Sequence, residues 1–231
     1  MEEIFDVYTR EGEYIGAQPK SVCHSKNPGF YHKPVWIYII NSKNEILVQR
    51  RSSTKKRFPN LWGMSSGGHV NSGEEIIEGA IRETQEELGI KSKKENYILC
   101  REYIDDSSWE IAQVFVAHLD FGIKDVTLQT EEVSEVKWFT LDEFKKLLNS
   151  DEHVPLSNDY KEILLAIIEN DIKKNKDKVD FDCDRRMSQM GKGDGSLFPF
   201  LGKRDRSYFD KTVLFQINRA NVINVRFRSI I

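Results

Sequence analysis

The stretch that decides the fold is Gly68-His-Val-Asn-Ser-Gly-Glu74-Glu-Ile-Ile-Glu-Gly-Ala-Ile-Arg82-Glu83-Thr-Gln-Glu86-Glu87-Leu-Gly89-Ile90. Between Glu74 and Leu88, apolar and small residues recur at steps of three and four, which predicts an amphipathic helix. Ser72 is predicted to be its N-cap, with Glu75 as the capping-box partner. Gly89 is predicted to end the helix as its C-cap.

Three glutamates of this helix share one face, because Glu83, Glu86 and Glu87 are three and four residues apart. Neighbouring carboxylates repel one another unless a cation neutralises them. An all-oxygen cluster suits a hard divalent ion such as Mg²⁺ or Mn²⁺, which typically bridges to substrate phosphates. The alternative interpretation is a solvated acidic helix face. Glu74 and Arg82 are placed to form an ion pair that fixes the loop to the helix.

The pattern G-x5-E-x7-R-E-x-x-E-E-x-G, followed by an apolar residue, resembles the signature of the Nudix hydrolase family. One departure is Thr84, where that family usually has an aliphatic residue. The resemblance implies that Glu83, Glu86 and Glu87 bind Mg²⁺ or Mn²⁺ together with the backbone carbonyl of Gly68. It also implies an enzyme that uses water to cleave a diphosphate linkage and releases two phosphorylated products.

The general base is not part of this signature, because in the Nudix family it is often a glutamate outside the motif. Glu110 and Glu132 are the two candidates in this chain. Glu74 and Arg82 match the positions of the structural ion pair that orients the loop in the family.

The resemblance extends from about Asp6 to Ile168, and it is to the Nudix branch related to isopentenyl-diphosphate isomerase. The segments that carry it are Val22-Cys-His24, Phe30-Tyr-His32, Leu47-Val-Gln-Arg-Arg51, Lys55-Lys56-Arg-Phe-Pro59-Asn-Leu-Trp62 and Gly67-Gly-His69. In the isomerase, three histidines and two glutamates bind a metal, and a cysteine and a glutamate transfer protons. The resemblance places His24, His32 and His69 at the histidine positions and Glu110 at the later glutamate.

Two positions depart from the isomerase pattern. The cysteine position is occupied by Gly67, and the second metal-binding glutamate is replaced by Ser108. Without a thiol, proton transfer to and from an alkene lacks its second partner. The sequence therefore favours hydrolase chemistry on an isomerase-like scaffold. The alternatives are an isomerase-like enzyme acting on prenyl diphosphates, or a Nudix-fold binding protein without turnover. The three histidines are interpreted as ordinary polar residues in preference to a second metal site, for which imidazole ligands would suit zinc or manganese.

A basic stretch follows the strand predicted at residues 45–50. Arg51 and Lys55 are predicted to bind the substrate diphosphate, since Arg offers a bidentate fork and Lys a point charge. The alternative is a solvated basic loop.

Strands and helices alternate along the chain. Besides the central helix, the pattern predicts a hairpin in residues 1–20, strands at 35–40, 45–50, 97–103, 109–119 and 133–139, and helices at 141–149 and 159–170. This order predicts an α+β protein with a mixed sheet. The resemblance implies a Nudix fold, in which the sheet is sandwiched between helices as α/β/α, with a C-terminal extension.

The net charge of -3 over 231 residues hides two unlike parts. Residues 1–172, predicted to be the Nudix hydrolase domain, have net charge -10, and residues 173–231 have net charge +7. Residues 173–196 are predicted to be a charged linker, and residues 197–231 a basic extension that forms a hairpin. Packing of the extension on the domain, or on a second subunit of a homodimer, is favoured over nucleic-acid binding.

The overall composition excludes several protein classes. The 25 aromatic residues require a core, and no apolar run is long enough to span a membrane. Three cysteines without a C-x-x-C pair indicate neither a disulfide framework nor a zinc motif. The acidic N-terminus has no secretory signal, so we expect a cytoplasmic enzyme whose partner is a small-molecule diphosphate.

Overall fold

The structure is a computed structural model that describes the backbone of residues 2–190 and the side chains as far as residue 175. The chain divides into two compact units, Met1–Asp184 and Arg185–Ile231. All nine strands and the helices before the last one lie in the first unit.

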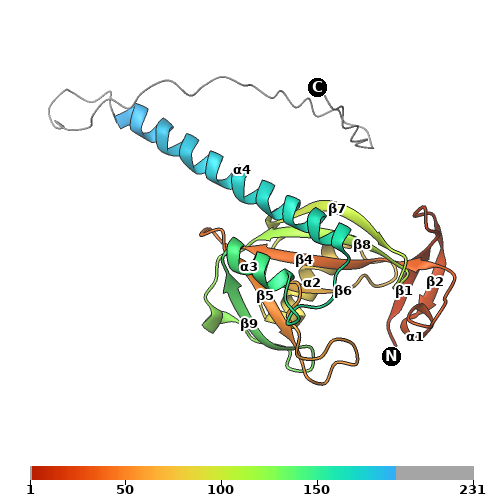
Figure 1. The fold of residues 1–231 in the computed structure, drawn as a ribbon. Coiled ribbons are helices and arrows are strands. Elements are labelled where there is room, and N and C mark those ends of the chain that lie inside the picture. The colour runs from red at the N-terminus through yellow and green to blue at the C-terminus, as the bar shows by residue number, and fades with distance from the viewer. Residues whose placement is uncertain (1, 191–231) are drawn as a thin grey trace, which may run out of the picture. The chain divides into compact units, whose positions relative to one another are not determined.

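A nine-stranded mixed sheet is the centre of the fold, with strand order β2-β1-β3-β8-β4-β5-β9 (Figure 1). Two further strands branch from this path, because β6 pairs with β4 and β7 pairs with β8. The strands are β1 (Ile4–Tyr8), β2 (Tyr14–Pro19), β3 (Tyr31–His32), β4 (Pro34–Ile40), β5 (Ile46–Arg51), β6 (Ser66–His69), β7 (Tyr97–Asp105), β8 (Glu110–His118) and β9 (Val133–Phe139).

Helices pack on both faces of this sheet. They are α1 (Lys20–Cys23), α2 (Ile76–Leu88), α3 (Leu141–Leu148) and α4 (Asn158–Met190), with 3₁₀ turns at Lys94–Asn96 and Ile123–Asp125. The helix α2 packs over one core cluster, and α3 and α4 pack over a second cluster on the other side. The predicted α+β class and the α/β/α layering are therefore confirmed.

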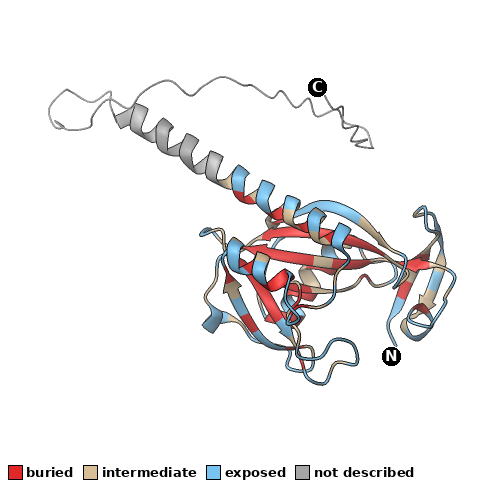
Figure 2. Cartoon of the chain, viewed as in Figure 1, coloured by how far each residue is buried: buried red, intermediate tan, exposed pale blue. Residues whose placement is uncertain are grey.

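The central strand β4 explains why two cores form. Alternate residues of a strand point to opposite faces, so Val35, Ile37 and Ile39 belong to the cluster under α2. Tyr38 and Ile40 belong to the cluster under α3 and α4. Because both faces are covered, β4 is apolar along its whole length, and it is buried except at Trp36, so it is mostly red in Figure 2.

The strands β4 and β5 diverge soon after their turn, and their paired register is limited to Ile40 and Ile46. The hydroxyl of Ser65 occupies the gap: it accepts a hydrogen bond from the amide of Ile39 at 2.7 Å and donates to the carbonyl of Leu47 at 2.5 Å. The divergence of β4 and β5 leaves room for β6 to pair with β4, and α2 packs against β6. This arrangement sets the position of the glutamate-rich segment at residues 68–90.

The N-terminal hairpin β1–β2 is attached through β1, which pairs with β3. The guanidinium of Arg10 donates two hydrogen bonds to the carboxylate of Asp106, at 2.8 and 2.9 Å. The hydroxyl of Ser72 donates to the carboxylate of Asp6 at 2.6 Å. The hairpin is therefore tied to both the β7–β8 turn and the loop before α2.

The two ends of α2 differ in how well the sequence predicted them. The prediction that Ser72 caps the helix is wrong: Ile76 is the first helical residue, Glu75 precedes it, and Ser72 contacts the N-terminal hairpin instead. Gly89 ends the helix as predicted, with the positive φ of 69° that favours glycine. A side chain there would also collide with Thr127.

The last helix is longer than predicted, since α4 continues to Met190 rather than ending near Asn170. Residues 173–190, predicted to belong to a charged linker, are therefore helical. The sequence has no Gly or Pro between Asn158 and Met190, so no residue there strongly opposes a helix. The predicted domain division at 172 stays a prediction, and the predicted hairpin at 197–231 lies outside the described residues.

Within residues 2–190, no helix combines the length and apolar character needed to cross a membrane.

Candidate functional site

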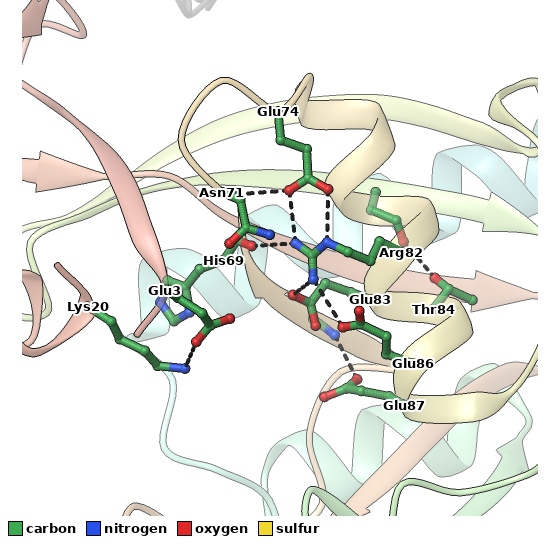
Figure 3. Close-up of polar contacts among 12 residues, drawn as sticks. Glu3, Lys20, His69, Asn71, Glu74, Arg82, Glu83, Thr84, Glu86 and Glu87 are labelled. Carbon is green, nitrogen blue, oxygen red and sulfur yellow. Dashed lines mark hydrogen bonds and ion pairs between the residues drawn. The ribbon is translucent and has the colours of Figure 1, made fainter. Parts of the chain in front are cut away.

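Arg82 is the centre of an ion-pair network on α2 (Figure 3). Its Nε and Nη2 donate to the two carboxylate oxygens of Glu74, at 2.8 and 2.9 Å. Its Nη1 donates to Glu83 at 2.7 Å and to Glu86 at 3.1 Å. Because Nη2 also donates to the carbonyl of His69 at 2.8 Å, this residue holds loop, helix and β6 together.

The carboxylate of Glu83 lies directly against the backbone of Gly68. A Cβ atom at Gly68 would lie 2.2 Å from the carboxylate carbon of Glu83, so no other residue fits there without displacing it. The motif therefore needs a glycine at this position for close approach between α2 and β6. The carbonyl of Gly68 and the three predicted metal-binding carboxylates come from these two adjoining elements.

Glu87 is the most deeply buried of the three glutamates, with 5% of its surface exposed. Its Oε2 accepts hydrogen bonds from the amide of Gly67 at 3.0 Å and from Nε2 of Gln49 at 3.4 Å. Burial, together with the nearby charge of Glu83, raises the pKa of Glu87 to about 8. Burial also raises the pKa of Glu83, although its bond to Arg82 opposes the shift.

These carboxylates need more positive charge than the described side chains supply. Arg82 contacts Glu74, Glu83 and Glu86, and among residues 2–175 no Lys or Arg forms an ion pair with Glu87. A buried acidic pair is costly in the ionised form unless a cation joins it. The donor set consists of carboxylate and carbonyl oxygens, which fits Mg²⁺ or Mn²⁺.

The predicted diphosphate-binding residues lie beside this cluster. Lys55 forms an ion pair with Glu132, one of the two candidate general bases. The half-buried Arg51 donates through Nε to the carbonyl of Arg57 at 3.2 Å. Burial lowers the pKa of Arg51, and the charges of Glu132 and Glu87 partly oppose that shift, so both carboxylates are near its guanidinium.

A second cluster consists of His24, His32, His69 and Glu110. Each residue offers one ligand atom, and these atoms all lie within 4.8 Å of one another. The Nε2 atoms of His24 and His69 are 3.1 Å apart, and Nε2 of both His32 and His69 is 3.8 Å from Oε1 of Glu110. Phe5 of the N-terminal hairpin stacks against the rings of His32 and His69.

The protonation state of this histidine cluster suits metal binding. Burial, together with the proximity of His69, lowers the pKa of His32 to about 4 and also lowers that of His24. Burial alone would raise the pKa of Glu110, but its contacts with His69 and His32 outweigh that effect and lower it. At neutral pH the lowered pKa values leave the rings of His24 and His32 unprotonated and the Glu110 carboxylate ionised, which are the forms that bind metals.

His32 provides a second observation that bears on metal binding by the histidine cluster. Its side chain is completely buried, and among the described residues neither ring nitrogen has a hydrogen-bond partner. A buried polar atom without a partner is unusual and costs about 1–3 kcal/mol. A metal bound by imidazole nitrogens and one carboxylate, such as Zn²⁺ or Mn²⁺, would satisfy it.

The structure separates the two candidate bases, since Glu132 lies near Glu87 whereas Glu110 belongs to the histidine cluster. Sequence reasoning did not single out Gln49 or Phe5. Gln49 stood in the segment Leu47–Arg51, but nothing in its spacing from Glu87 indicated that the two side chains meet. Phe5 is distant in sequence from the histidines it contacts.

Comparisons with known proteins give two relevant relatives. The chain is 32% identical over 164 residues to Nudix hydrolase 3 of Arabidopsis thaliana, which covers 65% of this chain but 21% of that protein. It thus spans about a fifth of that relative's length. It is 29% identical over 154 residues to isopentenyl-diphosphate Delta-isomerase 2 of Photorhabdus laumondii subsp. laumondii, covering 65% and 84% of the two chains.

A solved structure supports the same fold. The crystal structure of DR0079 from Deinococcus radiodurans matches with a TM-score of 0.56 and 20% identity, covering 73% of this chain and 98% of the other. The NUDIX domain family matches residues 30–160, which is more than half of the chain. The matched region includes α2 with its three glutamates. The chain therefore belongs to the Nudix hydrolase family.

Proposed function

We propose that this protein is a pyrophosphohydrolase dependent on Mg²⁺ or Mn²⁺, which cleaves the diphosphate linkage of a nucleoside-diphosphate derivative or another organic diphosphate. The observation that carries the proposal is the burial of Glu87 beside Glu83 without a paired cation among the described residues. Glu83, Glu86, Glu87 and the Gly68 carbonyl would hold the metal. When bound, the metal polarises a phosphoryl oxygen and makes water a better nucleophile.

The ion pair of Lys55 and Glu132 suggests how substrate and base are connected. A substrate phosphate is a stronger partner for Lys55 and the neighbouring Arg51 than a single carboxylate. Once Lys55 turns to the phosphate, Glu132 is free to accept a proton from the attacking water. The water oxygen then forms a bond to phosphorus, and the bridging P–O bond breaks.

Isomerase activity on a prenyl diphosphate is the alternative, and the surroundings of Gly67 disfavour it. A Cβ atom at Gly67 would lie 2.7 Å from the carbonyl oxygen of Val35 and 2.5 Å from the sulfur of Met64. A cysteine therefore does not fit without a backbone shift. Deuterium incorporation from heavy water into isopentenyl diphosphate would reveal isomerase activity, and we expect none.

We also propose a second metal in the histidine cluster. Its support is the proximity of four ligand atoms, all within 4.8 Å of one another, and the lack of a hydrogen-bond partner for the ring nitrogens of His32 among the described residues. Because imidazole ligands favour Zn²⁺ or Mn²⁺ over Mg²⁺, this centre would differ in metal preference from the glutamates of α2.

The deciding experiment measures hydrolysis of a broad panel of organic diphosphates with Mg²⁺ or Mn²⁺, by chromatographic separation of the phosphorylated products. The wild-type protein should turn over at least one compound, and Glu87→Gln should not. The matched control is Glu78→Gln, an exposed glutamate on the same helix, which should retain activity. Equal activity of the two variants would refute the metal assignment, and complete inactivity of the wild type would favour a binding protein.

A further inference from the structure

Gln49 of β5 connects the sheet to the carboxylates of α2. It is 5% exposed, and its Nε2 donates to Oε2 of Glu87 at 3.4 Å. Among the described residues its amide oxygen, Oε1, is buried and has no hydrogen-bond partner. Because Nε2 and Oε1 belong to one small planar group, the unpartnered oxygen is held close to the same carboxylate cluster.

The backbone around Gln49 leaves the side chain little freedom. The backbone N–H of Gln49 donates to the carbonyl of Met64 at 3.2 Å, and the backbone carbonyl of Gln49 accepts from the N–H of Gly63 at 2.9 Å. The residue is thus fixed between β5 and the segment that leads into β6. A buried side chain on a fixed backbone is well suited to orient another group.

The two hydrogen bonds that the described residues donate to Glu87 are both on one oxygen. Both Nε2 of Gln49 and the amide of Gly67 donate to Oε2. This arrangement leaves Oε1 of Glu87 available for a cation. It also means that Gln49 helps decide which carboxylate oxygen faces the site.

We propose that Gln49 is a positioning residue of the hydrolase site. Its Nε2 holds the ligating orientation of Glu87, and its Oε1 accepts a hydrogen bond from a water molecule at the carboxylate cluster. This inference rests on the proposed function of that cluster. An amide suits both tasks because it is neutral, donates on one side and accepts on the other.

The experiment compares Gln49→Met with Gln113→Met in the full chain. Gln113 is a matched control because it is also buried, at 3% exposure, and its Nε2 donates to a different glutamate, Glu102, at 2.8 Å. Mn²⁺ binding is measured by electron paramagnetic resonance, and the relevant site is the one lost in Glu87→Gln. Thermal unfolding of both variants shows whether they fold.

Gln49→Met should weaken Mn²⁺ binding at that site about 10-fold and lower kcat by about 10- to 100-fold, which is typical for residues behind a ligand. KM should change little, and Gln113→Met should resemble the wild type. Unchanged Mn²⁺ affinity and kcat in Gln49→Met would overturn the inference. So would equal losses in both variants, since these indicate a general effect of removing a buried amide.

The design also separates this inference from the proposed function. If the wild type binds Mn²⁺ but hydrolyses no diphosphate, the function fails, and the ratio of Mn²⁺ affinities still decides the role of Gln49. If Glu87→Gln removes no Mn²⁺ binding, both proposals fail. If Gln49→Met does not fold, Gln49→Glu takes its place. Glutamate keeps the side-chain size but removes the donor to Glu87. Full Mn²⁺ affinity and kcat in Gln49→Glu would contradict the inference.

Discussion

The two candidate metal-binding clusters of this protein lie next to each other yet differ in charge and in ligand type. They share the short strand β6, where Gly68 contacts the glutamates of α2 and the adjacent His69 belongs to the histidine cluster. The glutamate cluster has excess negative charge, and burial raises the pKa values of Glu83 and Glu87. In the histidine cluster, burial lowers the pKa values of His24 and His32.

Burial alone does not define the metal preference of a cluster. Burial favours the neutral form of every titratable group, so it makes carboxylates poor ligands and imidazoles good ones until a metal arrives. The glutamates therefore require a strongly charged, hard ion to ionise together, whereas the histidines are ready to bind a softer one. Each prediction below tests one side of this contrast.

The largest expected effect is that of Glu87→Gln on turnover. The amide keeps the shape but removes the charge that attracts the metal, so kcat/KM should fall about 10³-fold, equivalent to about 4 kcal/mol. Zinc affinity at the histidine cluster should remain, as measured by isothermal titration calorimetry. Loss of zinc binding in this variant would show that the two clusters form one site.

The next effect is that of His32→Asn on metal-linked stability. At a zinc concentration about 100 times the Kd, the wild type should gain about 2.7 kcal/mol in free energy of unfolding, and the variant should lose most of that gain. Mg²⁺-dependent turnover should change little. His153→Asn is the control, because it alters another buried histidine outside the cluster; similar results for both variants would contradict a specific zinc site.

A somewhat smaller effect is expected for Arg82→Lys. Lysine keeps the charge but cannot reach Glu74, Glu83 and the His69 carbonyl together. The loss of charge-assisted hydrogen bonds should reduce the free energy of unfolding by about 2 kcal/mol. Urea unfolding monitored by tryptophan fluorescence measures this change, and an unchanged midpoint would mean that the network is not stabilising.

The smallest effect is expected for Lys55→Ala, which removes one phosphate contact and releases Glu132. KM for the diphosphate should rise about 5- to 10-fold, equivalent to about 1 kcal/mol, with little change in kcat. Lys56→Ala is the neighbouring control. A decrease in kcat without a change in KM would place Lys55 in catalysis rather than in binding.

The sequence predicted the elements whose signals are local. The strand Val133–Phe139 and the C-terminal end of α2 at Gly89 agree with the predictions, because a segment rich in Val, Trp and Phe and a C-cap glycine are local signals. The strand β6 was missed, since Ser-Gly-Gly-His has no strand pattern and is held by its partner β4. Ser72 failed as a cap because Asp6, distant in sequence, is its partner.

The candidate site follows the same rule. Glu83, Glu86 and Glu87 share one helix face, so their proximity was predictable from spacing, and the contact of Glu74 with Arg82 spans a single loop. The histidine cluster joins four separate segments, and only the resemblance to an isomerase brought its members together before the fold was known. The contact between Gln49 and Glu87 depends on how β5 and α2 pack, which no local pattern encodes.

A metal bound in the histidine cluster would affect the stability of the N-terminal hairpin. The hairpin contributes Phe5, and the short helix that follows it leads into His24, whereas the remaining members of the cluster lie on the main sheet. A metal bound there would fasten the first two dozen residues to the sheet, and part of its binding free energy would become docking free energy. Chelation should therefore speed amide hydrogen exchange first in residues 4–24, before the body of the domain loosens.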